Sequence, residues 1–160
     1  MLTITENKWG SDHERVAGVL SNMGEVYRMQ RKYDKAIDVL NRALAIRKEK
    51  LGQDHQRTAY TLMRIANVLS SQGKLDEAME KYQQVMPIYE KEFGSDSVEM
   101  ATLLNNIALK LGKIMGTKIE PTRRRISANM NASDIFLHRH LSRSILKLLV
   151  MYKIEGTASK

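Results

Sequence analysis

One short turn occurs three times in this chain: Gly10-Ser-Asp-His13, Gly52-Gln-Asp-His55 and Gly94-Ser-Asp-Ser97. Each copy begins 42 residues after the previous one, and the apolar residues that follow keep this interval, as do Leu20, Leu62 and Leu104. Self-similarity at a fixed period is typical of repeat proteins, in which each unit buries its apolar face against a neighbour. The sequence therefore predicts two full copies of a repeat and the beginning of a third.

Each copy contains two stripes of apolar residues with the period of a helix. The first stripe advances in steps of three and four through Ala17, Leu20, Met23, Gly24 and Tyr27. A break follows at Arg31-Lys32, or at Gly73-Lys74 in the second copy, and a second stripe runs from Ala36 to Leu51. Small residues such as Gly24 allow the paired helices to approach closely. The pattern predicts an all-α fold of tandem antiparallel helix hairpins.

Acidic and polar residues mark the expected helix starts. The aspartates that follow the turn glycines suit the N-cap region of the next first helix: Asp12, Asp54 and Asp96. Asp34 and Asp76 lie where each second helix should begin, and there a carboxylate is favoured by unpaired amides and by the helix dipole. His13 and His55 occupy equivalent positions, and each is interpreted as a polar ring that closes the turn between repeats.

One residue conflicts with the helical pattern. Pro87 falls within the second helix of the second copy, at the position that Ala45 takes in the first. Proline removes one backbone hydrogen bond and crowds the preceding turn, which costs about 3 kcal/mol in an unadapted helix. We expect a kink or an early break near Val85–Pro87.

Residue content and motifs argue against an enzyme. The 160 residues include no cysteine, so disulfides, thiolate ligands and cysteine nucleophiles are excluded. No phosphate-binding loop, zinc-protease helix motif or nucleophile elbow occurs. His13 and His55 lie a whole repeat apart, and the i,i+2 spacing of His138 and His140 would direct their rings to different helix faces. We expect no metal, no cofactor and no catalysis. No apolar run of about 18 residues and no secretory leader pattern is present, which predicts a soluble protein of the cytosol or nucleus.

The repeat resembles the tetratricopeptide repeat, in the 42-residue form of kinesin light chains and related proteins. The resemblance rests on the glycine–aspartate–histidine turns, the Leu20–Gly24 and Leu104–Ala108 cores, Gly73–Ala78, and Ala43–Gly52. It covers about Trp9 to Leu111 and implies a short right-handed superhelix whose first helices line a concave groove for peptides. It further implies an adaptor or cargo-recognition role in the cytoplasm, with possible attachment to the cytoskeleton. The coiled coil that would join a motor heavy chain is absent.

Carrying this groove onto the chain gives a set of candidate contact residues on the first helices. They are Ser21, Asn22, Glu25, Tyr60, Met63, Arg64, Asn67, Thr102, Asn105 and Asn106. An asparagine amide can donate and accept at once, which suits a peptide backbone whatever its side chains. Arg64 offers a forked donor for a carboxylate, and it shares one repeat position with Asn22 and Asn106. The expected partner is a protein or peptide bound without chemistry.

Charge divides the chain unevenly. Residues 1–112 hold 16 lysines and arginines against 15 acids, whereas residues 113–160 hold 10 against 3. Such a break marks a change of structural role. We expect a remnant of a preceding repeat or a lead-in over 1–10, the repeat array over 11–112, a basic linker over 113–132, an amphipathic helix over 133–154 and a disordered tail over 155–160. Both ends depart from the repeat, which suggests a fragment or alternative product of a longer array.

The basic C-terminal stretch leaves several interpretations open. Its helix could cover the open end of the array, lie on an anionic membrane, or have no settled structure. Arg124-Arg-Ile-Ser127 also resembles a site for basophilic serine kinases, with Ser127 as acceptor. The alternative to a peptide-binding module is thus a peripheral membrane- or nucleic-acid-associated protein, although nucleic acid is the less favoured partner. The exposed ends of the array also offer surfaces for further repeats or self-association.

Overall fold

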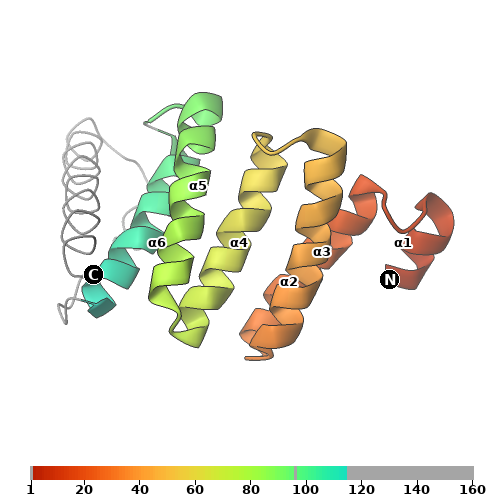
Figure 1. The fold of residues 1–160 in the computed structure, drawn as a ribbon, viewed down its shortest axis with the longest axis horizontal. Coiled ribbons are helices and arrows are strands. Elements are labelled where there is room, and N and C mark those ends of the chain that lie inside the picture. Colours follow the sequence, from red (N-terminus) through yellow and green to blue (C-terminus); the bar gives the residue numbers. More distant parts are fainter. Residues whose placement is uncertain (1, 96, 115–160) are drawn as a thin grey trace, which may run out of the picture. The chain divides into compact units, whose positions relative to one another are not determined.

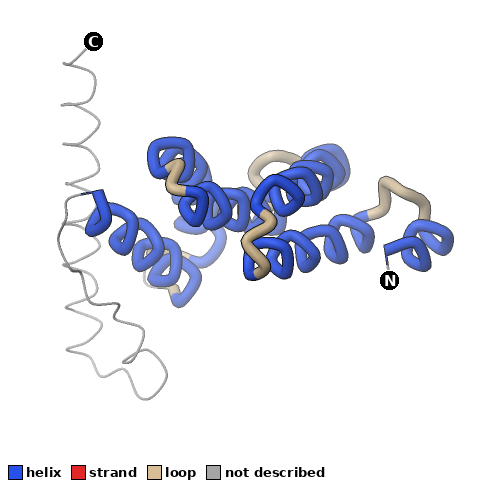
Figure 2. Tube along the Cα trace, turned by 90° about the horizontal axis from the view of Figure 1, so that it is seen from below, coloured by secondary structure: helices blue, strands red, loops and turns tan. Residues whose placement is uncertain are grey.

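The computed structural model describes residues 2–95 and 97–114, with the side chains of residues 110–114 left aside. The described chain forms the helices α1 (Leu2–Trp9), α2 (Glu14–Met29), α3 (Tyr33–Leu51), α4 (Gln56–Gln72), α5 (Leu75–Phe93) and α6 (Val98–Ile114) (Figure 1). Figure 2 shows helices and connecting loops, and no strand, over these described residues. The all-α fold and the helix breaks at Arg31-Lys32 and Gly73-Lys74 are therefore confirmed.

The chain divides into two compact units, one ending at Glu92 and the other beginning at Phe93. The first unit holds α1 to α4 and nearly all of α5, so it contains both complete repeats. The second holds α6, the first helix of the third copy, whose described residues reach Ile114. The expected boundary at residue 112 stays a prediction. The remaining residues of the expected linker, the expected helix over 133–154, the tail over 155–160 and Ser127 all lie outside the described residues.

Within the first unit, α2 to α5 run side by side in alternating directions (Figure 1). The residues Val16, Ala17, Leu20, Ala43 and Ile46 form the core between α2 and α3. Gly24 sets the closeness of this pair, because a Cβ atom placed on it would lie 2.5 Å from Cγ of the buried Leu40. A glycine here removes the side chain that would otherwise hold the helices apart, as the sequence pattern predicted.

Histidines, rather than the preceding aspartates, cap the first helices. The Nδ1 atom of His55 accepts the backbone N–H of Arg57 at 3.0 Å, and His13 makes the same bond to Arg15 at 3.1 Å. In the third copy, Ser97 Oγ accepts the backbone N–H of Met100 at 3.2 Å. Asp12 and Asp54, the caps expected from the sequence, each lie one residue before the histidine that caps the helix. Asp96 lies outside the described residues. Because Nδ1 stands as far from Cα as an aspartate oxygen does, histidine can satisfy the same unpaired amide.

Replacing His55 with alanine should lower the free energy of unfolding by about 1 kcal/mol, the usual loss for a helix cap. His55→Asn should retain most of the stability, since the asparagine oxygen can accept the same amide. Asp54→Ala serves as the matched control and should have little effect. Urea unfolding followed by circular dichroism measures all three variants. A larger loss for Asp54→Ala than for His55→Ala would show that the cap is assigned to the wrong residue.

The expected early break at Pro87 does not occur, because α5 continues through it to Phe93. Pro87 and Gln83 are both exposed, so the Gln83 carbonyl that lacks a helical donor lies on the side where water can bind it. On the opposite side, Val85 before the proline and Tyr89 after it are both buried, so both halves of the helix keep their apolar face in the core. The proline is tolerated because its defect faces solvent.

Candidate functional site

The first helices of the two complete repeats, α2 and α4, contact one another. Arg64 on α4 makes the central contact of this surface: its Nη1 donates to the Ser21 carbonyl and to Asn22 Oδ1, the latter at 3.3 Å. Its Nη2 donates to the Tyr60 hydroxyl at 2.8 Å, and its guanidinium lies 4.7 Å from the centre of the Tyr60 ring. Asn22 and Arg64 share one repeat position, so stacking has brought equivalent residues together from 42 positions apart.

Of the two charged groups on this surface, Glu25 is hydrogen-bonded to an opposite charge and Arg64 is not. Glu25 accepts a fork of hydrogen bonds from Arg28, with the shortest contact at 2.6 Å from Nη2 to Oε1. The bonds from Arg28 lower the pKa of Glu25, although partial burial opposes them, and they raise the pKa of Arg28. Glu25 is therefore matched by Arg28. The oxygens that Arg64 bonds are all neutral, which leaves its positive charge without a hydrogen-bonded carboxylate.

The other residues expected in the groove are placed less uniformly. Ser21 and Met63, which share a repeat position, are buried at 2% and 9% exposure, because this position faces the neighbouring helices instead of solvent. Asn67 is half-buried, and its Oδ1 accepts the Tyr82 hydroxyl of α5 at 2.5 Å. Ser21 and Met63 accordingly take no part in the exposed surface, whereas Asn22, Glu25, Tyr60 and Arg64 do.

Three of the expected groove residues lie on α6, in the second unit. Thr102 is exposed and donates its hydroxyl to the Val98 carbonyl at 2.8 Å. Asn105 and Asn106 are half-buried. The contacts between α2 and α4 lie within the first unit. That Asn106, which shares the repeat position of Asn22 and Arg64, also contacts a bound peptide therefore stays a prediction.

A buried arginine, which the sequence pattern did not single out, joins the two repeats. Arg47 of α3 is 6% exposed, and its Nη1 donates to Thr61 Oγ1 at 2.7 Å and to the Arg57 carbonyl at 3.1 Å. Burial lowers its pKa, while Glu14, with Oε1 3.7 Å from Nε, partly offsets that effect. Glu14 also pairs with Arg57 at 3.0 Å. The repeat alignment could have indicated that Arg47 is buried, because Arg47 shares its repeat position with Tyr89, which is also buried.

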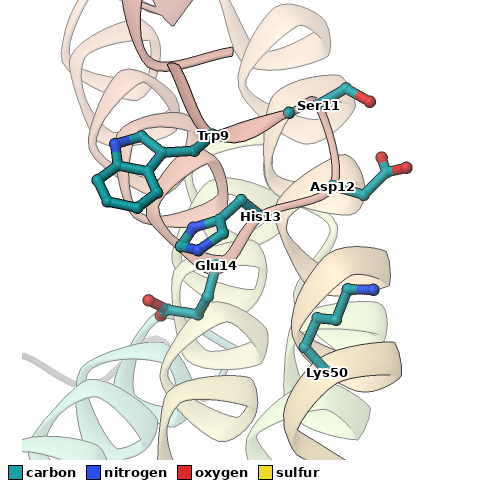
Figure 3. A pocket seen from close by; sticks show the side chains of 7 residues that line it. Trp9, Ser11, Asp12, His13, Glu14 and Lys50 are labelled. Carbon is teal, nitrogen blue, oxygen red and sulfur yellow. The ribbon is translucent and has the colours of Figure 1, made fainter. Parts of the chain in front are cut away.

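An open pocket of about 510 Å³ lies at the turn between α1 and α2 (Figure 3). Its lining comprises Trp9, Gly10, Ser11, Asp12, His13 and Glu14 with Lys50 of α3. The Trp9 ring lies 5.1 Å from that of His13 and 4.3 Å from the Arg15 guanidinium, so its faces are already engaged. None of the expected groove residues lines this pocket. The sequence signal for it was a tryptophan where the other copies have Leu51 and Phe93.

Residues 2–95 and 97–114 contain neither a metal site nor a membrane span. No group of three or more histidine, aspartate or glutamate side chains there is arranged to hold a metal ion. Within the same part of the chain, no helix combines the length and apolar character needed to cross a bilayer.

The fold and the stacked first helices define a helical-repeat protein built from 42-residue hairpins. The family model for the tetratricopeptide repeat matches residues 3–49, 15–91 and 57–113, and the chain belongs to this family. These repeats generally form protein-interaction scaffolds, and the chain is a repeat module of that kind.

Two solved structures share the fold. BtubC (BKLC) from P. vanneervenii matches with a TM-score of 0.61 and 16% identity, over 84% of this chain and 57% of that one. A candidate kinesin light chain from Podosopora anserina, with nearly identical TPR-like repeats, matches with a TM-score of 0.64 and 14% identity, over 99% of this chain and 84% of that one. This chain thus spans little more than half the length of BtubC. No curated protein sequence matches it significantly.

Proposed function

We propose that the exposed surface formed by Asn22, Glu25, Tyr60 and Arg64 binds an extended segment of a partner protein. The observation that carries this proposal is the Arg64 guanidinium, which is held in place by neutral oxygens and has no hydrogen-bonded carboxylate of its own. A preorganised guanidinium can form two parallel hydrogen bonds to a carboxylate, because its planar donors match the two oxygens. The segment should therefore carry an acidic side chain or a terminal carboxylate at this point.

The neighbours of Arg64 suit the rest of such a segment. Tyr60 is 40% exposed and offers an aromatic face, and the exposed Asn22 amide can bond to a peptide backbone. Glu25 forms its ion pair with Arg28 and interacts with Arg64 only through space, so no carboxylate hydrogen-bonds to the Arg64 guanidinium. This arrangement favours an adaptor that recognises a partner by contact alone, without catalysis. We further propose that it acts in the cytoplasm, as kinesin-light-chain-like adaptors do.

Arg64→Ala should weaken binding of the tightest dodecapeptide from an unbiased library by about tenfold to a hundredfold, the usual loss for a hydrogen bond to a charged group. Isothermal titration of the full chain measures the affinity, and circular dichroism checks that the variant remains folded. Arg42→Ala is the matched control, because Arg42 is an exposed arginine of α3 that pairs with Glu6 at 2.6 Å. It should leave the affinity unchanged. Equal affinities for the wild type and Arg64→Ala would refute the proposed surface.

The basic C-terminal stretch supplies the alternative function, attachment to an anionic membrane or nucleic acid. The charge excess in residues 113–160 favours it. Binding to anionic vesicles that falls steeply with added salt and is indifferent to Arg64→Ala would support this alternative over the peptide surface.

A further inference from the structure

The turns that end α2 and α4 share one backbone geometry. In the first, the N–H of Lys32 bonds to the Tyr27 carbonyl at 2.9 Å and that of Arg31 to the Arg28 carbonyl at 3.0 Å. In the second, Lys74 and Gly73 repeat these bonds to Leu69 and Ser70 at 2.9 and 3.2 Å. Both are Schellman turns, in which the residue after the helix adopts a left-handed conformation. The second turn therefore serves as an internal reference for the first.

The left-handed residue differs between the two turns. Gly73 has a φ of 88°, a conformation that glycine adopts without strain, whereas Arg31 stands at the same position with a φ of 59°. The Arg31 side chain is exposed, and it takes part in no side-chain hydrogen bond or ion pair with another described residue that would offset this strain. A strained residue without an internal partner points to a use outside the fold.

Two further differences surround Arg31. Lys35 takes the position of Glu77, which in the second turn lies 4.0 Å from Lys74, so the first turn lacks the acid that would pair with Lys32. The exposed Asp34 carboxylate accepts a hydrogen bond from the neutral Gln72 amide at 3.1 Å and keeps its negative charge, and the described structure shows no ion pair between Asp34 or the exposed Asp38 and these lysines. The first turn thus presents three exposed cations without an ion pair in the described structure, Arg31, Lys32 and Lys35, beside the single acid Asp34.

An apolar side chain accompanies these cations. Met29 is 73% exposed at the end of α2, where the second repeat has a half-buried serine, Ser71. An exposed methionine is adaptable and suits binding to varied apolar partners. The first turn therefore combines positive charge with an exposed apolar side chain. In the second turn, Lys74 is paired with Glu77, and a serine stands at the position of Met29.

We propose that the turn formed by Met29, Arg31, Lys32 and Lys35 is a second docking surface, which binds an acidic segment of a partner protein that also carries an apolar side chain. Charge complementarity selects the acidic partner, and Met29 requires an apolar group beside the acids. A protein segment fits better than a membrane, because three cations around one turn fall short of the clusters of about four to eight that bind anionic lipid. This surface is distinct from the one that contains Arg64.

The test replaces three residues of the first turn with the residues that the second turn has at the same repeat positions. The variant Met29→Ser, Arg31→Gly, Lys35→Glu introduces only the residues that the second turn already carries, so the hairpin should fold. The probe is a dodecapeptide of glutamate with leucine and phenylalanine, titrated into the isotopically labelled full chain by NMR. Two control peptides replace glutamate with glutamine, or leucine and phenylalanine with serine.

In the wild type, the probe should shift the amide resonances around residues 29–35, and each control peptide should do so more weakly. The triple variant should lose about tenfold in affinity at this site and should unfold at a higher temperature, since glycine relieves the strain. Arg64→Ala should leave these shifts in place, which separates this surface from the first one. No shift around the turn, or an unchanged affinity in the triple variant, would overturn the proposal.

Two other occupants would also overturn it. Pelleting with phosphatidylserine vesicles that the triple variant abolishes, without peptide binding at the turn, would assign the patch to a membrane. Concentration-dependent self-association in sedimentation velocity, lost in the same variant, would assign it to a second copy of the chain.

Discussion

Leu40→Ala is expected to lower the free energy of unfolding by about 2–5 kcal/mol, because it removes a fully buried side chain from the first hairpin. Gly24→Ala should lower it by about 1–3 kcal/mol for the opposite reason. Its new methyl group would lie 2.5 Å from Leu40 Cγ, and the surrounding core leaves Leu40 little room to move.

The two substitutions should not add. In the double variant, the alanine at position 24 enters space that the shortened residue 40 has vacated, so the combined loss should be smaller than the sum by about 0.5–3 kcal/mol. Urea unfolding of the wild type, both single variants and the double variant gives this coupling energy. Gly18→Ala is the matched control, since a Cβ atom there meets nothing within 4 Å. Simple additivity would mean that α2 and α3 do not meet at this point.

Tyr82→Ala should lower the free energy of unfolding by about 3–5 kcal/mol, the usual range for a large buried aromatic residue. Tyr82 is fully buried, and its hydroxyl donates to Asn67, so it joins α5 to α4. Tyr82→Phe retains the ring and should lose only about 1–2 kcal/mol at neutral pH, mainly from the unpaired Asn67 oxygen.

The same residue should make stability sensitive to alkaline pH. Burial raises the pKa of the Tyr82 hydroxyl well above the ordinary value of 10.0. Above pH 10 the unfolded chain can release this proton while the folded chain keeps it, so the free energy of unfolding falls as pH rises. The Tyr82 contribution should be about 1.4 kcal/mol per pH unit above pH 10 and should disappear in Tyr82→Phe. Parallel pH profiles for the two proteins would contradict the burial of this phenol.

The periodic features of the sequence were sufficient to predict the fold. The interval between the turns fixed the number of hairpins, and the spacing of residues such as Leu20 and Gly24 located the face that each helix buries. Pro87 shows where local rules fail. Its cost depends on which side of the helix faces solvent, and this orientation follows from how α5 packs.

The candidate site was predictable only in part, because its chemistry depends on contacts between repeats. The pairing of Asn22 with Arg64 followed from their shared repeat position. Neighbouring helix residues point about 100° apart, however, so Ser21 beside Asn22 is directed to the interior. Which first-helix positions are covered is decided by the next repeat, and no single-helix pattern contains that information. The left-handed conformation of Arg31 was equally hard to predict, because the only indication of it in the sequence is the alignment of Arg31 with Gly73.

The most direct test of the central claim is to map amide chemical shifts of the full chain on binding the tightest dodecapeptide from an unbiased library. The proposed function predicts that the largest changes cluster at Asn22, Tyr60 and Arg64, on the surface shared by α2 and α4. Changes confined to α3 and α5, or to the residues after Ile114, would contradict the assignment of peptide binding to the stacked first helices.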